Sequence, residues 1–194
     1  MQVLEKINKK IKYDKIEETF KGCKKANIAC IGSFIIGTPD ETSEDLQQTI
    51  DLVKRLDTSL INMNYLALIP GSEIYKDLVK SGKYVEAKSI EEFGKQNPLE
   101  NLEYNFSQIP DKDIKVVRAY FMWNSFTASD VPGTKKFDFA KKVIIDALKS
   151  IKTGDFISFV FSTYSAGVEF LKAAYYAHFF PSVRKKYGLY KNKQ

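Results

Sequence analysis

Residues 28–42 read IACIGSFIIGTPDET, and this stretch decides the fold class. Its first nine residues are an almost unbroken apolar run of strand length, which is typical of a parallel strand buried on both faces. Residues 37–41 then form a turn, and Thr42 is a good N-cap for a helix whose first turn holds Glu44 and Asp45. The stretch therefore predicts a strand followed directly by a helix, as in α/β proteins.

The flanking sequence repeats this pattern. A second strand is expected at residues 60–68 (LINMNYLAL), followed by a Pro70-Gly71-Ser72 turn and a helix at residues 73–80 that Gly82 would end. A helix is also predicted before the first strand, over residues 3–26. This order predicts a right-handed βαβ unit with parallel strands and a further crossover helix.

The character of the chain changes after residue 84. Turn residues dominate the next segment, and amphipathic patterns follow it. The expected elements are a loop over 84–110 with a short helix at 89–94, then helices over 111–129, 136–152 and 155–180. We therefore expect two domains, residues 1–84 with the strands and residues 85–194 as a mainly helical extension with a basic tail.

Composition excludes several classes of site. With 44% hydrophobic and 28% charged residues, the 194-residue chain is globular in type. Two cysteines, Cys23 and Cys30, and one histidine exclude a disulfide scaffold, a four-cysteine cluster and a histidine-based metal centre built by this chain alone. Both cysteines are expected to be small buried hydrophobes rather than ligands. Met1 runs into a lysine-rich amphipathic stretch rather than a signal peptide, so we expect a cytoplasmic protein.

The positive charge is concentrated at the carboxyl end. Residues 181–194 carry +5 of the net +6 and contain no acid. We expect a solvated tail, with contact to an anionic membrane surface or to RNA as the alternatives, and the balanced body argues against a nucleic-acid partner. Residues 156–168 are uncharged, but Glu169 and Lys172 interrupt the run, which favours a buried or interfacial helix over a membrane span. This aromatic helix and the basic tail together would suit peripheral contact with a membrane surface.

Strand alternation assigns residues to faces. Ser33, Ile35 and Gly37 share one face of the first strand, and Asn62 and Asn64 share one face of the second. Buried amides need hydrogen-bond partners. The two asparagines therefore either point into a polar lumen near a ligand or bond neighbouring strand residues or water.

Three segments together resemble the closing part of a radical S-adenosylmethionine (radical SAM) barrel. They are GSFIIGTPDET at 32–42, NYLALIPGSEIYKDL at 64–78 and the opening QVLEKINKK at 2–10. That family commonly has a strand ending in G-x-P-x-E-T, a following strand ending in P-G-[ST]-x-[IL]-Y, and a Q-x-V/I-L-x-x-[IM]-N-K helix after its fourth strand. The resemblance covers about residues 2–84. The remainder is similar in style to C-terminal extensions of the cobalamin-binding subgroup.

The resemblance implies cofactors that the family uses. A CxxxCxxC loop after the first strand holds a [4Fe-4S] cluster, which cleaves S-adenosylmethionine reductively to a 5′-deoxyadenosyl radical, and the subgroup adds cobalamin. In such enzymes the strands matched here line the adenine side of the cofactor pocket. Together with the alternation, the resemblance assigns to that side Ser33, Ile35, Ile36, Gly37, Asn64, Leu68, Ile69 and Pro70.

The cysteine pattern departs from the family. The two cysteines are spaced C-x6-C, and no CxxxCxxC is present. We therefore expect the C-terminal portion of a parallel, partial TIM-like barrel that is not catalytically competent alone and binds neither cofactor tightly. The missing N-terminal barrel portion would come from the same chain or from a separate subunit, because two strands with apolar, unpaired edges make a marginal sheet. The alternatives are a stand-alone non-catalytic partner or membrane-surface module, and an unrelated small α/β protein with chance motifs.

Overall fold

The fold is mixed α/β. The computed structural model describes residues 9, 11, 13–56, 60–96, 102–126, 141, 145, 167–168, 171–172 and 174–189. Its elements are α2 (Tyr13–Lys25), β1 (Ile31–Ile36), α3 (Ser43–Arg55), β2 (Leu60–Tyr65), α4 (Glu73–Lys80), α5 (Ile90–Gln96), α6 (Asp111–Phe126) and α9 (Pro181–Lys186). Within these residues β1 and β2 form a parallel sheet, in a register that runs from Ile31↔Leu60 to Ile36↔Tyr65.

Local sequence signals predicted most helix boundaries correctly. Thr42 caps α3 through a capping box, because its side chain accepts from the Asp45 N–H and the Asp45 carboxylate accepts from the Thr42 N–H. The predicted helix at residues 73–80 is α4, and Gly82 follows it with a φ of +70°. The short helix and the helix after Pro110 are also confirmed, as α5 and α6.

Three predicted boundaries were wrong. The helix α2 begins at Tyr13, and residues 9 and 11 are not helical, so the predicted helix over residues 3–26 is not continuous. The strands are shorter than predicted, since β1 starts at Ile31 and β2 ends at Tyr65. The predicted helices at 136–152 and 155–180 lie mostly outside the described residues, although residues 174–179 are helical as expected.

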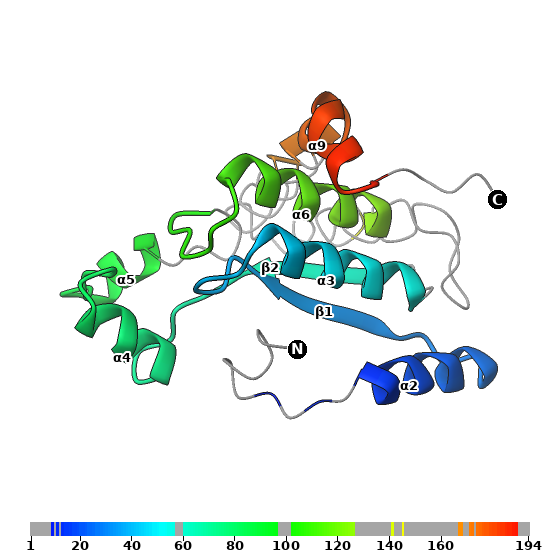
Figure 1. The fold of residues 1–194 in the computed structure, drawn as a ribbon, viewed down its shortest axis with the longest axis horizontal. Coiled ribbons are helices and arrows are strands. Elements are labelled where there is room, and N and C mark those ends of the chain that lie inside the picture. The colour runs from blue at the N-terminus through cyan, green and yellow to red at the C-terminus, as the bar shows by residue number, and fades with distance from the viewer. Residues whose placement is uncertain are drawn as a thin grey trace.

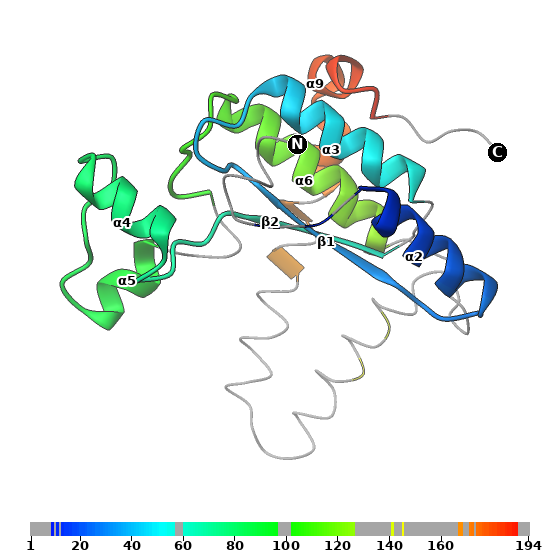
Figure 2. The ribbon, with the colours of Figure 1, turned by 60° about the horizontal axis from the view of Figure 1, so that its bottom comes forward.

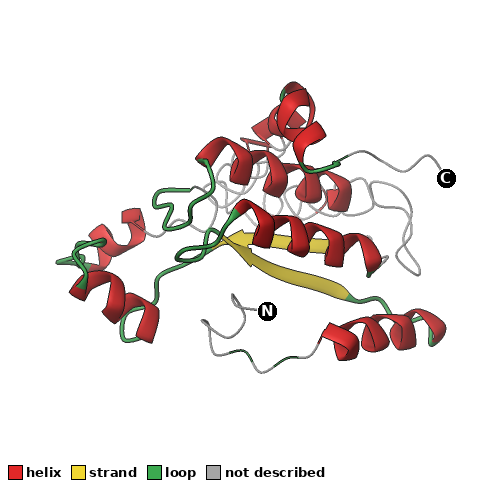
Figure 3. Cartoon of the chain, viewed as in Figure 1, coloured by secondary structure: helices red, strands yellow, loops and turns green. Residues whose placement is uncertain are grey.

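The larger of the two hydrophobic clusters among the described residues lies between the sheet and the helices. Figures 1, 2 and 3 show α3, α6 and α9 on one side of the two strands, with α4 and α5 grouped beyond the carboxyl ends of the strands. The core residues are Ile36, Leu46, Ile50, Val53, Ile61, Met63, Tyr65, Ile109, Ile114, Val116, Val117, Tyr120, Phe121, Val183, Tyr187 and Leu189. Residues from both sides of the predicted boundary at 84/85 therefore contribute to the same core.

The prediction of a solvated basic tail was wrong for residues 181–189. Tyr187 and Leu189 are buried in the core, where a fully buried side chain of this size is worth about 1.5–3 kcal/mol. Lys186 Nζ donates to Asp113 Oδ2 at 2.7 Å, and the Tyr187 hydroxyl donates to the same oxygen at 3.1 Å. Two apolar anchors and one ion pair thus attach this basic segment to α6. Residues 190–194 lie outside the described residues.

The outer edge of β2 is closed by side chains of α6. Ser125 Oγ accepts from the Ile61 N–H and donates to the Ile61 carbonyl, both at 2.8 Å. Arg118 Nε donates to the Met63 carbonyl at 3.1 Å. The prediction that both sheet edges are unpaired was therefore wrong for β2, because a helix from the C-terminal region satisfies the backbone groups that a further strand would bind.

The outer edge of β1 is different. The Leu66 N–H donates to the Ile36 carbonyl, so residues 32, 34 and 36 direct their backbone groups toward β2. The N–H and carbonyl groups of Ser33 and Ile35 consequently point away from β2. Among the described residues none pairs with them. Within the part of the chain that the structure describes, the sheet therefore has one closed edge and one edge open to strand addition.

Removing the Ser125 hydroxyl should destabilise the fold. Ser125→Ala leaves the edge N–H and carbonyl of Ile61 without their partner, so we expect the free energy of unfolding to fall by about 1–2 kcal/mol. Urea denaturation followed by circular dichroism measures the change, with Ser182→Ala on the exposed face of α9 as the matched control. Equal stability of the two variants would contradict the edge-closing role.

The open edge of β1 should make the isolated chain self-associate. Ser33→Pro removes an outward-pointing N–H without removing a bond to β2, so it should suppress concentration-dependent association. Ser33→Ala keeps that N–H and is the control. Sedimentation velocity over a range of concentrations compares the two variants. Association that is unchanged in Ser33→Pro would show that another surface is responsible.

Candidate functional site

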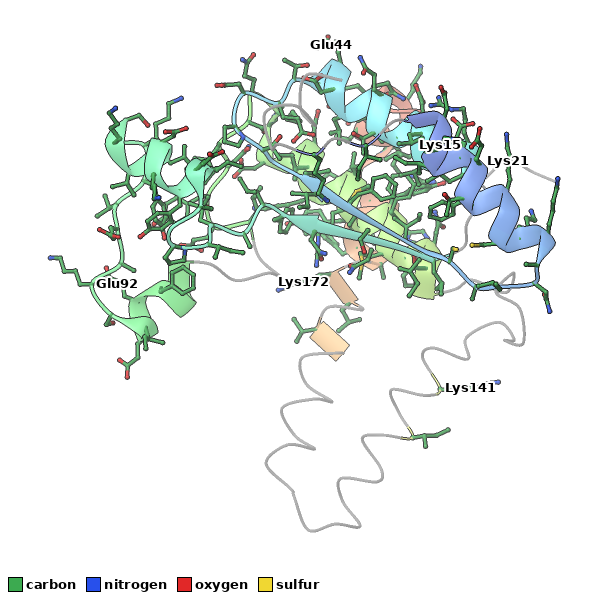
Figure 4. All side chains as sticks on the ribbon, turned by 90° about the horizontal axis from the view of Figure 1, so that it is seen from below. Lys15, Lys21, Glu44, Glu92, Lys141 and Lys172 are labelled. Atoms are coloured by element: carbon green, nitrogen blue, oxygen red, sulfur yellow. The ribbon has the colours of Figure 1, made fainter. Side chains whose placement is uncertain are left out.

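The sheet face opposite the helices is open to solvent. Ile31 and Ile35 of β1 are 63% and 41% exposed, whereas Ile36 on the other face is 0% exposed. The register sets Ser33 beside Asn62 and Ile35 beside Asn64 on the open face. Figure 4 views this face, with Lys15 and Lys21 of α2 and Glu44 of α3 pointing away from it. Apolar side chains and amides thus alternate across one flat surface.

The strand alternation was right about the asparagines but wrong about their burial. β1 and β2 are each buried on one face only, not on both. Asn62 is exposed and Asn64 is half-buried, so solvent reaches both amides. The energetic penalty for an unpartnered buried amide does not apply here. The two side chains are consequently available to a ligand or to a covering segment.

Two similar turns follow the carboxyl ends of the strands. The Glu41 N–H donates to the Thr38 carbonyl across Pro39-Asp40, and the Ser72 N–H donates to the Ile69 carbonyl across Pro70-Gly71. Asp40 has a φ of +61° and Gly71 a φ of +89°, so each turn has proline second and a left-handed residue third, as in type II turns. Each turn leads into a capped helix. The same local chemistry therefore shapes both loops beside the open face.

A buried carboxylate organises the first of these loops. Glu41 is 2% exposed, and its Oε2 accepts from the Gly37 N–H at 2.8 Å, the Thr38 N–H at 2.9 Å and the Thr38 hydroxyl at 3.2 Å. Burial raises the pKa of Glu41 above its ordinary value, although the hydrogen bonds from Thr38 and Gly37 act in the opposite direction. Sequence reasoning missed this role. The available signal was the sequence G-T-P-D-E, in which Glu41 comes four residues after Gly37 and three residues after Thr38.

Gly37 lies on the opposite side from the one that alternation predicted. Its φ of +81° turns the backbone at the strand end, so a Cβ there would face Ile114 and Leu102 at 3.9 and 4.0 Å rather than the side of Ser33 and Ile35. A substitution such as Gly37→Val would therefore act through backbone strain in the turn. It would not act by projecting a side chain over the open face.

The structure divides the predicted site residues into three groups. Ser33, Ile35 and Asn64 lie together on the open face, and Ile69 and Pro70 are exposed in the second loop. Three predicted residues are buried elsewhere, namely Ile36 and Gly37 on the helix side and Leu68 in a smaller core with Tyr75, Leu78 and Tyr84. Ile31, Leu60 and Asn62 also lie on the open face and were not among the predicted site residues.

The cysteines lie at the other end of the sheet. Cys23 is in the last turn of α2 and Cys30 directly precedes β1, so both are at the amino end of that strand (Figure 1). Each is partly exposed, which corrects the prediction of buried hydrophobes. Among the described residues no three Cys, His, Asp or Glu side chains are grouped as a metal site would require.

The aromatic residues of the C-terminal region are partly at the surface. Leu171, Tyr175 and Phe179 are all exposed, and Tyr175 stacks on Phe179 at 5.2 Å between ring centroids. Of the helices that the structure describes, none has the length and apolar character needed to cross a bilayer. Peripheral contact with a membrane surface stays a prediction.

Comparison with known proteins finds two distant relatives. The chain is 35% identical over 75 residues to an uncharacterized methyltransferase from Pyrococcus horikoshii, an alignment that covers 39% of this chain and 16% of that protein. It is 30% identical over 113 residues to tRNA-2-methylthio-N(6)-dimethylallyladenosine synthase from Petrotoga mobilis, covering 55% of this chain and 26% of that protein. The alignments thus span about a sixth and a quarter of these relatives. No family model matches the sequence, and no solved structure matches the fold.

The buried carboxyl group gives stability a pH dependence. Because the raised pKa favours the protonated form in the folded state, the free energy of unfolding should fall as pH rises from 4.5, the ordinary pKa, through the raised value. Glu41→Gln keeps a carbonyl acceptor for Gly37 and Thr38 but stays neutral. We therefore expect the free energy of unfolding of Glu41→Gln, relative to that of the wild type, to be higher at about pH 8 than at about pH 4. Urea denaturation at both pH values measures this difference.

The exposed Glu44 of α3 supplies the matched control for this experiment. Glu44→Gln should not reproduce the pH-dependent gain, because an exposed carboxyl group meets no comparable cost of burial. A Glu41→Gln effect that is the same at both pH values, or that shrinks as pH rises, would contradict the assignment.

Proposed function

We propose that this chain is the closing part of a radical SAM barrel, and that its open sheet face lines the adenine side of the S-adenosylmethionine pocket. In this proposal the chain supplies the last two strands, β1 and β2, and their loops. The preceding strands continue the sheet from β1. The helical region after α4 closes the outer edge of β2 through α6 and does not carry the iron–sulfur cluster.

The asymmetry of the two sheet edges carries this proposal. In a parallel barrel each strand is followed by a helix on the outside, and side chains of the inner face line the lumen. Here helices cover one face, the other face is open, and α6 closes only the β2 edge through Ser125 and Arg118. This arrangement is the one expected at the end of a barrel, with β2 as the last strand and β1 paired with the strand that precedes it.

The two relatives support the same conclusion. One is named as a methyltransferase, and the other as a synthase of a methylthio-modified nucleoside in tRNA. The synthase is a radical SAM family member. Since the alignments cover small parts of both proteins, the substrate and the reaction of the complete protein do not follow from them. The shared property that we propose is the cofactor pocket.

The residues present do not fit the cluster. A [4Fe-4S] cluster requires at least three closely placed thiolates, and this chain has only Cys23 and Cys30, at the amino end of β1. Ligands in parallel α/β folds bind at the carboxyl ends of the strands. The cluster would therefore have to be held by the preceding part of the barrel.

The open face does fit an adenosyl group. Ile35 offers a flat apolar surface, and Asn64 beside it offers an amide that can both donate and accept hydrogen bonds, as the edge of adenine does. Ser33 and the exposed Ile69 and Pro70 would bound this surface on two sides. The buried Ile36, Gly37 and Leu68 would act indirectly, by fixing the strand ends and turns. S-adenosylmethionine, when bound, is the source of the radical in this family.

The main proposal and its alternative differ in which polypeptide supplies the strands before β1, the same chain or a separate partner protein. An in-frame CxxxCxxC upstream in the gene, and a native polypeptide well above 22.2 kDa on an immunoblot, would support one continuous enzyme. A native polypeptide of 22.2 kDa would instead support a separate partner protein that supplies the cluster and pairs with β1.

Two substitutions on the same strand and face test where the cofactor lies. In the complete, cluster-reconstituted protein, Ile35→Asp puts a charge beside the proposed adenine site, whereas Ile31→Asp puts the same charge at the amino end. We expect Ile35→Asp to weaken S-adenosylmethionine affinity by about tenfold or more and Ile31→Asp to leave it within about twofold. Isothermal titration calorimetry measures both affinities.

Equal affinity of the two variants for S-adenosylmethionine would overturn the placement of the adenine. Circular dichroism spectra of both variants check that the complete protein remains folded. The isolated chain should show neither a four-iron absorption spectrum after anaerobic reconstitution nor S-adenosylmethionine binding. A reconstituted four-iron cluster on this chain alone would contradict the proposed division of roles.

A further inference from the structure

The described helical residues 171–172 and 174–179 are attached to the core by one face. Ala177 is 2% exposed, and Tyr176 and the following Phe180 pack against the larger hydrophobic cluster. The rings of Tyr176 and Phe180 also stack on each other, with 5.5 Å between their centroids. This face therefore holds the helical residues against the body of the protein.

The opposite face presents apolar side chains to solvent. Leu171, Tyr175 and Phe179 follow one another at intervals of four residues, so they form one stripe along the helix, which we call the apolar stripe. Their side chains are 68%, 50% and 68% exposed. Lys172 follows Leu171 directly and so lies beside the stripe. Large apolar side chains that are exposed together on one face mark an interaction site, whereas scattered single ones are ordinary.

The segment that carries the apolar stripe is basic. Residues 170–194 contain five lysines and one arginine but no aspartate or glutamate. Lys186 is paired with an aspartate of α6, whereas Lys185 is exposed in α9. The exposed Lys112 of α6 adds a further positive charge, since its Nζ lies 4.7 Å from the centre of the Phe180 ring. Cations thus accompany the stripe at both of its ends.

We propose that the apolar stripe is a binding site for an anionic lipid surface, on which the helix lies in the plane between headgroups and acyl chains. Helices that bind in this way carry leucine and aromatic side chains on one face and lysine or arginine beside them. Aromatic rings are favoured at this depth of a bilayer. The stripe contains none of the residues of the proposed cofactor pocket, and the proposal does not depend on that pocket.

Two observations favour a lipid surface over another macromolecule. The centres of protein–protein interfaces are depleted in lysine, whereas lysine lies beside this stripe. Single-stranded RNA binds by stacking its bases on open ring faces. Here the Tyr175 ring stacks on Phe179 at 5.2 Å between centroids and also contacts the rings of Tyr176 and Phe180 at 5.3 and 5.5 Å. The ring at the centre of the stripe is therefore already surrounded by aromatic neighbours.

The experiment measures binding of the full chain to lipid vesicles. One set of vesicles is phosphatidylcholine alone, and the other is an equimolar mixture of phosphatidylcholine and phosphatidylglycerol. Flotation in a density gradient separates vesicle-bound chain from self-associated chain, which does not float. We expect an affinity about tenfold or more higher for the anionic vesicles, decreasing as the salt concentration is raised.

Variants inside and outside the apolar stripe identify the surface that binds. Leu171→Gln and Phe179→Gln remove apolar side chains from the stripe, so each should lower the affinity for anionic vesicles by about tenfold. Lys172→Gln should lower it by about fivefold and leave binding to the neutral vesicles unchanged. Ile90→Gln on α5 is the matched control, because Ile90 is 90% exposed and should leave the affinity within about twofold. Circular dichroism checks that each variant retains its helix content.

Three results would overturn the proposal. The first is a chain that does not float with the anionic vesicles, and the second is a loss of affinity in Ile90→Gln as large as that in the stripe variants. The third is flotation that the stripe variants leave unchanged. If those variants instead alter the oligomeric state in sedimentation velocity, or weaken binding to single-stranded RNA, the stripe belongs to a second copy of the chain or to RNA. No readout involves S-adenosylmethionine, so the proposed function stands or fails separately.

Discussion

The outward-pointing backbone groups of β2 impose the constraint on which the arrangement of the domain depends. A two-stranded sheet has two edges, and each unpaired N–H or carbonyl that loses water costs free energy. Ser125 and Arg118 of α6 supply partners for Ile61 and Met63, so α6 has to lie along that edge. With α6 fixed there, its apolar residues form the centre of the core, and the segment 181–189 is held against it by Asp113.

Features encoded by neighbouring residues were predictable from the sequence. The Thr42 cap of α3 and the stop of α4 at Gly82 each depend on residues close to one another in the sequence, and both are present. The strand order and the parallel pairing followed from the strand–helix–strand pattern. The alternation along β1 correctly put Ser33 and Ile35 on one face, because the strand is regular between those residues.

Features that depend on distant residues were not predictable in this way. Nothing near Ser125 in the sequence indicates that its hydroxyl bonds a strand 64 positions earlier. The basic composition of residues 181–189 favoured a solvated tail, yet Tyr187 and Leu189 supply enough apolar surface to bury it. At Gly37 the left-handed backbone ends the alternation, so the period-two pattern was extended one residue too far. Glu41 was missed because its role depends on the turn that its own carboxylate stabilises.

Among the described residues, the unpaired backbone groups and the exposed isoleucines of the sheet are concentrated at β1. Its edge presents the backbone groups of Ser33 and Ile35, and its open face presents Ile31 and Ile35 to water. A single parallel strand added at this edge would pair the backbone groups and would extend the open face into a curved wall that shields those isoleucines. A strand added beyond β2 would do neither and would first have to displace Ser125 and Arg118. The physical cost of each alternative therefore favours growth of the sheet from β1, on the side that the preceding strands of a barrel would occupy.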